Sequence, residues 1–132
     1  MTITTFIPPI VELRLLGVFE PGVPNKERVV LKAEANIDIG WYAVILSLRS
    51  AQAGHATPIR DSMYWFGSGN VATNDWFFLY TGSGTNSTIP TADGKNKIFI
   101  EHWGKKQTIF HNNQIVPVLW RVSGIVVERT AL

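Results

Sequence analysis

Short runs of β-branched and aromatic residues, each bounded by a cluster of Gly, Pro, Asn or Asp, recur along the whole chain. Clear examples are ERVVLKAEA (Glu27–Ala35), WYAVILSLR (Trp41–Arg49) and DWFFLYT (Asp75–Thr81). Runs of this length and composition are typical of strands, and the clusters between them supply turns. The pattern therefore constrains the chain to an all-β fold of about nine short strands, arranged as a sandwich or a barrel.

Further strands are expected at IVELRLLGVF (Ile10–Phe19) and SMYWF (Ser62–Phe66), and two hairpins are expected towards the C-terminus. In the first, KIFIEHW and QTIFHN, residues 97–103 and 107–112, flank a turn at Gly104-Lys105. In the second, IVPVLWRV and IVVERT, residues 115–122 and 125–130, flank Ser123-Gly124. NIDIG (36–40) is predicted as a turn and SAQAGHATP (50–58) as a loop, and no segment predicts a stable helix.

The strand DWFFLY is apolar on both of its faces. Because side chains alternate along a strand, Trp76, Phe78 and Tyr80 share one face, and Phe77 and Leu79 share the other. A strand of this kind is usually central in a sandwich or covered by a loop, so these aromatic residues are expected to belong to the core. The alternative is an exposed platform on which sugars or bases stack.

The length of 132 residues fits one domain, with residues 1–9 as an N-terminal extension and residues 10–132 as a single β-sandwich. A hydrophobic fraction of 45% and a charged fraction of 17% are those of a globular protein rather than a disordered one. The chain contains no cysteine, which excludes disulfides, thiolate metal sites and a cysteine nucleophile.

The N-terminus, MTITTFIPPIVELRLLGVFEPG, lacks the positively charged start of a signal peptide, and Pro8, Pro9, Glu12 and Arg14 interrupt its apolar run. No stretch approaches the roughly twenty apolar residues that a membrane-spanning helix needs. A cytoplasmic protein that does not insert into membranes is therefore expected.

The sequence shows only weak signals for a phosphate-binding, metal-binding or catalytic site. Neither GSG loop, at 67–69 or 82–84, leads into a helix, and neither is followed by the lysine and hydroxyl residue of a phosphate-binding loop. In the predicted hairpin, His102 and His111 lie about 14 Å apart, too far to share a metal ion. No serine stands in a nucleophile elbow, and the carboxylates are scattered singly. The sequence therefore predicts neither an enzyme nor a cofactor or metal.

Charge is distributed unevenly. Residues 1–94 carry six basic and eight acidic side chains, whereas residues 95–132 carry six basic and two acidic ones. The C-terminal third therefore holds the candidate binding surface, which could attract a polyanion through salt-sensitive contacts with phosphates. Its predicted residues are Lys95, Lys97, His102, Trp103, Lys105, Lys106 and Arg121. The alternative interpretation is that these cations simply solvate the faces of strands.

Taken in order, several segments resemble the lamin-tail domain, a family found at the C-terminus of nuclear lamins and widely in bacterial proteins. They are the strand at 10–19, ERVVL (27–31), IGWYAV (39–44), FFLYTGSG (77–84) and HNNQIVPVLWRVSGIVV (111–127). The chain departs from the family at Ile115-Val116, where members often have Gly-Asp. The resemblance covers most of residues 10–128.

The resemblance implies an immunoglobulin-like β-sandwich of mainly antiparallel strands that works by interaction rather than catalysis. It also implies that the glycines of TGSG serve a turn or a close approach of the backbone. We therefore expect a non-enzymatic binding or scaffolding module that contacts another protein or self-associates through an edge strand. The alternatives are nucleic-acid binding through the basic surface, and carbohydrate binding through Trp65 or Trp103. A small-molecule ligand is not expected.

Overall fold

The computed structural model describes residues 8–51 and 55–128, which form ten strands and a single turn of 3-10 helix at Ile39–Trp41. This confirms the predicted all-β fold. The strands are β1 (Leu13–Phe19), β2 (Arg28–Ala33), β3 (Ile37–Asp38), β4 (Tyr42–Arg49), β5 (Ala56–Trp65), β6 (Asn70–Val71), β7 (Trp76–Tyr80), β8 (Ser87–Pro90), β9 (Lys97–His102) and β10 (Ile115–Arg121).

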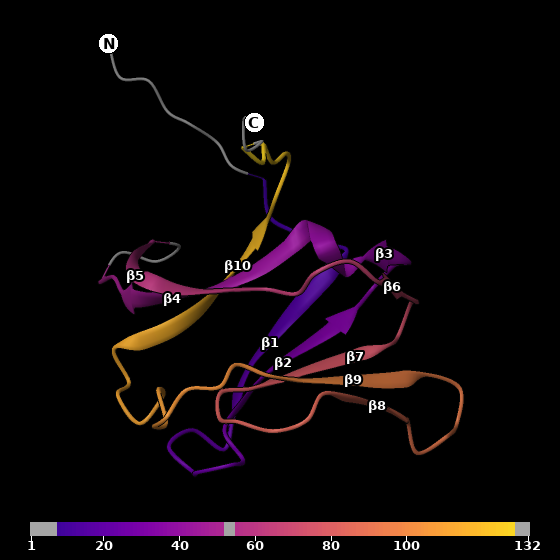
Figure 1. The fold of residues 1–132 in the computed structure, drawn as a ribbon, viewed down its shortest axis with the longest axis horizontal. Helices are drawn as coiled ribbons and strands as arrows, with labels where there is room; N and C mark the ends of the chain where they lie inside the picture. Colours follow the sequence, from indigo (N-terminus) through magenta and orange to yellow (C-terminus); the bar gives the residue numbers. More distant parts are fainter. Residues whose placement is uncertain (1–7, 52–54, 129–132) are drawn as a thin grey trace, which may run out of the picture.

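The strands form a two-layered sandwich (Figure 1). One layer is a five-stranded sheet in the order β1-β2-β7-β9-β8, and the other is a three-stranded sheet in the order β10-β4-β5. Strands β3 and β6 pair as a short separate ribbon. All paired strands are antiparallel except β7 and β9, which are parallel. The core combines Leu31 and Leu79 of the larger sheet with Val44 and Leu46 of the smaller one.

Strand β7 is the centre of the larger sheet and alternates as the sequence predicts. Phe77 and Leu79 point into the core and are 3% and 0% exposed. Trp76, Phe78 and Tyr80 point to the outer face, where they are half-buried. The prediction that the aromatic residues of this strand belong to the core is therefore confirmed for Phe77 and wrong for Trp76, Phe78 and Tyr80, which lie on a covered outer surface.

Cationic side chains cover the outer face of the larger sheet. The Arg28 guanidinium lies 5.5 Å from the centroid of the Phe78 ring and 5.6 Å from that of Tyr80. The Lys32 ammonium lies 5.4 Å from the Trp76 ring centroid. Long basic side chains bury their aliphatic stems on apolar surface while their charge interacts with the faces of aromatic rings. These rings are thus partly shielded from water by the protein itself.

The predicted hairpin at Gly104-Lys105 is wrong. The segment Gln107–Asn112 forms turns instead of a strand, although Gly104 does adopt a turn conformation with φ of +81°. Strand β9 pairs with β7 on one edge and with β8 on the other, so it has no free edge for a hairpin partner. The residues that would have formed the ladder bury Phe110 in the core instead.

The second predicted hairpin, at Ser123-Gly124, is also wrong in the part that the structure describes. Residues 125–128 contain no strand, and Arg129 and Thr130 lie outside the described residues. Strand β10 pairs with β4 alone and is the edge of its sheet among the described residues, and its last residue, Arg121, forms an ion pair with Glu12. Elsewhere, β3 begins within the predicted turn at 36–40, and β5 begins within the predicted loop at 50–58.

A buried carboxylate fastens three segments at one end of the sandwich. The Glu27 side chain lies just before β2, and the residue is 1% exposed. It accepts hydrogen bonds from the amides of Gly22, Ile109 and Phe110 and from the Thr81 hydroxyl, at 2.6–2.9 Å. Each buried charge needs such donors to offset its lost hydration. Glu27 therefore joins the loop before β2, the end of β7 and the segment that follows β9.

The loop 82–84 uses one glycine for close approach. A Cβ at Gly84 would overlap the His102 imidazole, which stacks on Tyr80 with the ring centroids 5.3 Å apart. Neither Gly82 nor Gly84 has a positive φ. Of the two roles that the sequence left open for these glycines, Gly84 therefore serves the close approach of the backbone.

Candidate functional site

The structure places the four lysines of the predicted basic surface in two separate pairs. Lys95 and Lys97 lie at the start of β9, whereas Lys105 and Lys106 follow its other end. The six residues of β9 keep the pairs about 15–20 Å apart along the sheet. Each pair borders a different hollow of the surface.

The other three predicted residues are engaged in separate contacts. His102 stacks on Tyr80 at the outer face of the larger sheet. Trp103 packs against the core, with its ring centroid 5.7 Å from that of Tyr64, and the Lys105 ammonium lies 5.3 Å from the same ring. Arg121 belongs to β10 in the smaller sheet and contacts Glu12 at 2.6 Å. The seven residues thus do not form one continuous patch.

The outer face of the three-stranded sheet is apolar at its centre, and the alternation of β4 places the exposed Arg49 at the end of this face. Alternate residues of β4, β5 and β10 point away from the core, and the register sets Trp65 and Trp120 on either side of Ala43. Met63 and Val118 flank Ile45 in the same way. We call this surface the tryptophan face, and its residues are Ala43, Ile45, Ser47, Met63, Trp65, Val116, Val118 and Trp120.

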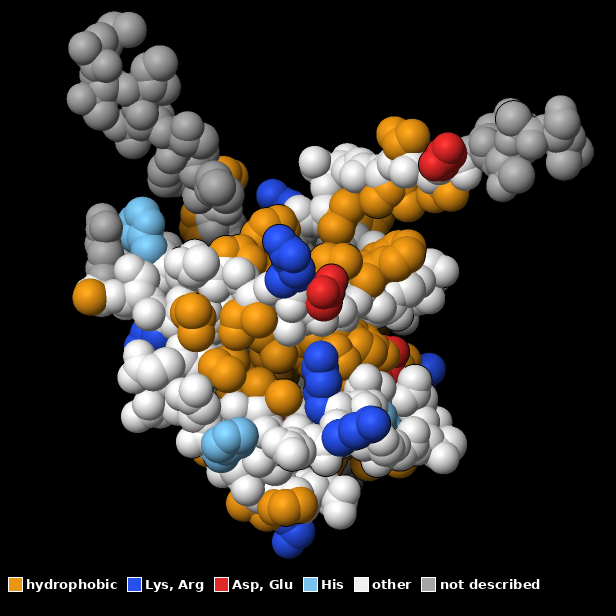
Figure 2. Space-filling model, turned by 60° about the vertical axis from the view of Figure 1, so that its left-hand side comes forward, with side chains coloured by type: hydrophobic (Ala, Val, Ile, Leu, Met, Phe, Trp, Pro, Cys, Tyr) orange, Lys and Arg blue, Asp and Glu red, His pale blue; other side chains and the backbone are white. Residues whose placement is uncertain are grey.

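Large side chains of the tryptophan face remain open to water. Met63, Trp65 and Trp120 are 58%, 51% and 48% exposed. Figure 2, which brings the left-hand side of Figure 1 forward, shows hydrophobic side chains gathered in the middle of the view with charged side chains standing singly among them. Exposed apolar surface that is contiguous and rimmed by polar residues marks interaction sites on folded proteins.

Trp65 is held in place rather than free to rotate. Its indole Nε1 donates a hydrogen bond to the carbonyl of Gly40 at 2.7 Å. A side chain that is fixed before binding loses less conformational entropy when a partner covers it.

The two tryptophans proposed for carbohydrate stacking differ in exposure. Trp65 is exposed, whereas Trp103 is packed on the core and beneath Lys105.

The sequence pointed to Trp65 but missed Met63 and Trp120. A signal was present, because IVPVLWRV is apolar at both alternating positions. One set of its side chains, Ile115 and Leu119, packs on the core. The other set includes Val116, Val118 and Trp120. These side chains lie on the outer surface, because none of the described residues forms a layer over this side of the sheet.

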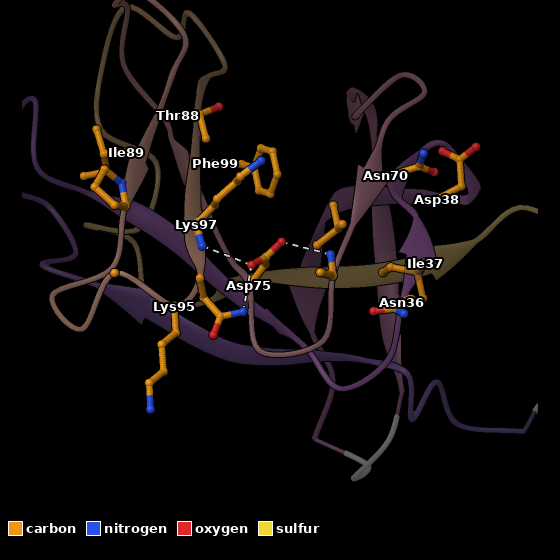
Figure 3. A pocket seen from close by; sticks show the side chains of 15 residues that line it. Asn36, Ile37, Asp38, Asn70, Asp75, Thr88, Ile89, Lys95, Lys97 and Phe99 are labelled. Carbon is orange, nitrogen blue, oxygen red and sulfur yellow. Dashed lines mark hydrogen bonds between the residues drawn. The ribbon is translucent and has the colours of Figure 1, made fainter.

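A groove of about 820 Å³ opens beside β8 and β9 (Figure 3). Five strands of the larger sheet face only three in the smaller, so the inner side of β8 and β9 is incompletely covered, and the β3–β6 ribbon stands across the gap. Thr88, Ile89, Lys97 and Phe99 form one wall, and Asn36, Ile37, Asp38 and Asn70 form the other. Lys95 points away from both walls (Figure 3).

Asp75 lies between these walls, and its carboxylate is engaged in hydrogen bonds within the protein. It is 4% exposed and accepts hydrogen bonds from the amides of Ala72 and Lys97 and from the Asn96 side chain, at 2.9–3.0 Å. Burial alone would raise the pKa of Asp75, but these hydrogen bonds outweigh it and hold the pKa below its usual value. Asp75 therefore braces the start of β9 as an anion at neutral pH.

Across residues 8–51 and 55–128, no three His, Asp or Glu side chains gather closely enough to share a metal ion. The same residues include no helix with the length and apolar character needed to span a bilayer. The fold defines the class of this protein as an all-β sandwich. No protein-family model, curated protein or solved structure matches the chain.

Proposed function

We propose that this chain is a non-enzymatic binding module that acts through protein–protein contact, with the tryptophan face as its interface. The observation that carries the proposal is a sheet face with an uncharged centre, on which Met63, Trp65 and Trp120 are about half exposed. Interface centres are depleted in charge and enriched in Trp and Met, and the few residues that dominate binding are often Trp.

Charge complementarity favours a second copy of the chain as the occupant. The eight residues of the tryptophan face carry no charge and Arg49 lies beyond them at the end of β4, so the centres of two copies can meet without electrostatic repulsion. The outer face of the larger sheet carries charges of both signs, including Lys32 and the ion pair of Arg28 with Glu20, and such charges lose hydration when an interface buries them. A twofold contact also uses one patch twice, which is the commonest arrangement of protein dimers.

Sedimentation equilibrium across a concentration series tests this proposal. The wild-type chain is expected to dimerise reversibly, and Trp120→Lys is expected to raise the dimer dissociation constant at least about 30-fold, as for an interface residue worth roughly 2 kcal/mol. A charge at this position must be buried without a partner when the dimer forms. Circular dichroism checks that the variant stays folded, since Trp120 is 48% exposed.

Ile89→Lys is the matched control. Ile89 is 44% exposed, but it belongs to β8 of the larger sheet, outside the tryptophan face. The control is expected to dimerise like the wild type. A wild-type chain that stays monomeric at every concentration, or an equal effect of both substitutions, would contradict the proposed interface.

The immunoglobulin-like topology and the nucleic-acid and carbohydrate alternatives stay predictions. The separation of the lysine pairs supplies no single cationic patch for a nucleic acid, and we therefore place protein contact first. A carbohydrate would use Trp65, so a titration with soluble glycans followed by tryptophan fluorescence distinguishes that alternative from self-association.

A further inference from the structure

A second, smaller hollow of about 320 Å³ continues from the groove of Figure 3 towards the core. Its volume lies at the lower end of the range for small-molecule sites. Three aromatic rings line it, from Phe66, Phe77 and Phe99, and we call it the phenylalanine hollow. The rings support one another, with 4.6 Å between the centroids of Phe66 and Phe77 and 5.7 Å between those of Phe77 and Phe99.

Glu101 is the charged residue that lines the phenylalanine hollow. It lies on the inner side of β9, two residues after Phe99, and its Oε1 accepts a hydrogen bond of 2.6 Å from the Tyr64 hydroxyl. The other lining residues are uncharged, and the mouth is formed by Ser68, Gly69, Asn70, Asn86, Ser87 and Thr88.

Glu101 is half-buried, and its carboxylate accepts fewer hydrogen bonds than the buried carboxylates of Glu27 and Asp75. Glu27 accepts four hydrogen bonds and Asp75 accepts three, whereas Glu101 accepts one from the described residues. Burial raises the pKa of Glu101, and the single bond from Tyr64 only partly offsets this. The half-buried carboxylate of Glu101 therefore keeps acceptor capacity that a ligand with a donor or a positive charge can use.

We infer that the phenylalanine hollow binds the ammonium group of a small organic cation, such as a quaternary or alkylated amine. The aromatic rings attract a cation through their negative faces, and Glu101 neutralises its charge at the inner end. This site rests on residues separate from the tryptophan face, so it is independent of the proposed interface. It also differs from the sequence-based expectation that a small-molecule ligand is absent.

Other charges near the hollow bear on its affinity. Lys97 shares the inner side of β9 with Phe99 and Glu101 and lines the adjoining groove, as does Asp38. The Asp38 carboxylate already accepts hydrogen bonds from the amides of Gly40 and Gly69. Lys97 would repel a bound cation modestly, because it lies at the more solvated end of the cleft. Glu101 therefore remains the anion best placed to pair with a ligand.

An NMR titration of the full chain with choline, compared with 3,3-dimethyl-1-butanol, tests the inference. The two compounds share a shape, but only choline is charged. Choline is expected to shift the amide signals of residues 68–71 and 86–88 and to bind about tenfold more tightly than the neutral alcohol. Equal affinities, or shifts confined to other parts of the chain, would overturn the proposal.

Glu101→Gln separates the charge from the shape of the hollow. The substitution is expected to weaken choline binding about tenfold and to leave the neutral alcohol unchanged. Glu128→Gln, at an exposed position beyond β10, is the control and should leave both unchanged. Phe99→Leu keeps an apolar wall without the ring and should also weaken choline selectively. Retention of wild-type choline affinity in Glu101→Gln and Phe99→Leu would rule out the site.

Discussion

Replacing Glu27 with alanine is expected to lower the free energy of unfolding by about 3–5 kcal/mol, as for the removal of one partner from a buried charged network. The substitution leaves three amides and the Thr81 hydroxyl without their acceptor in an environment that is 1% exposed. Each unsatisfied buried donor costs roughly 1–3 kcal/mol when water cannot reach it. Urea denaturation followed by circular dichroism measures the loss.

The control for this prediction is Glu34→Ala. Glu34 has a side chain that is 37% exposed and lies 3.6 Å from Arg14, so its ion pair is solvated. Exposed pairs of this kind contribute about 0–1 kcal/mol. If Glu27→Ala destabilised the chain no more than Glu34→Ala does, Glu27 would not fasten the sandwich.

The strands themselves could be predicted because their signal is local. In β7 the alternation separates Trp76, Phe78 and Tyr80 from Phe77 and Leu79, whatever pairs with the strand, but it does not decide which set faces the core. The two failed hairpins show the limit. A Gly-Lys or Ser-Gly pair predicts a turn but not the strand after it. At Gly104-Lys105 no strand can follow as a partner of β9, because β7 and β8 already occupy both of its edges. Beside β10, which pairs with β4 alone, no occupied edge explains why residues 125–128 form no strand.

The candidate sites likewise depend on both a local signal in the sequence and contacts between distant segments. The apolar positions of the tryptophan face are visible in the sequence, yet their exposure depends on the absence of a covering layer. The phenylalanine hollow unites Phe66, Phe77 and Phe99 from three separate segments. The parallel pairing of β7 with β9 brings Phe77 and Phe99 together, and no local pattern predicts that pairing.

The buried carboxylates of Glu27 and Asp75 differ from the half-buried carboxylate of Glu101 in a way that the sequence does not distinguish. Glu27 and Asp75 each accept several hydrogen bonds from backbone amides, which bind the charged form and stabilise the fold. Glu101 accepts one, from a tyrosine, and burial raises its pKa. The number of donors thus separates carboxylates that serve stability from one that is available to a ligand.

Acid is expected to remove the stability advantage of the wild type over Glu27→Gln. Burial alone would raise the pKa of Glu27, but the hydrogen bonds from Thr81, Ile109, Gly22 and Phe110 outweigh it and hold the pKa below its ordinary value of 4.5. The stabilising contribution is therefore complete above the pKa of the unfolded chain, and it disappears as the pH falls through the lower pKa of the folded chain.

Once protonated, Glu27 resembles glutamine because it presents a donor to the same amides, so the two proteins should converge in stability. The measurement is urea denaturation of both proteins from pH 7 to about pH 2, where the contribution is lost. The change with pH at Asp75 is common to both proteins and cancels in their difference. A constant difference in stability between the wild type and Glu27→Gln at every pH would show that Glu27 acts through packing rather than charge.

Glu101→Gln is expected to show the opposite effect, because a raised pKa in the folded chain favours the neutral form of Glu101. The stability of this variant is expected to equal or exceed that of the wild type at pH 7.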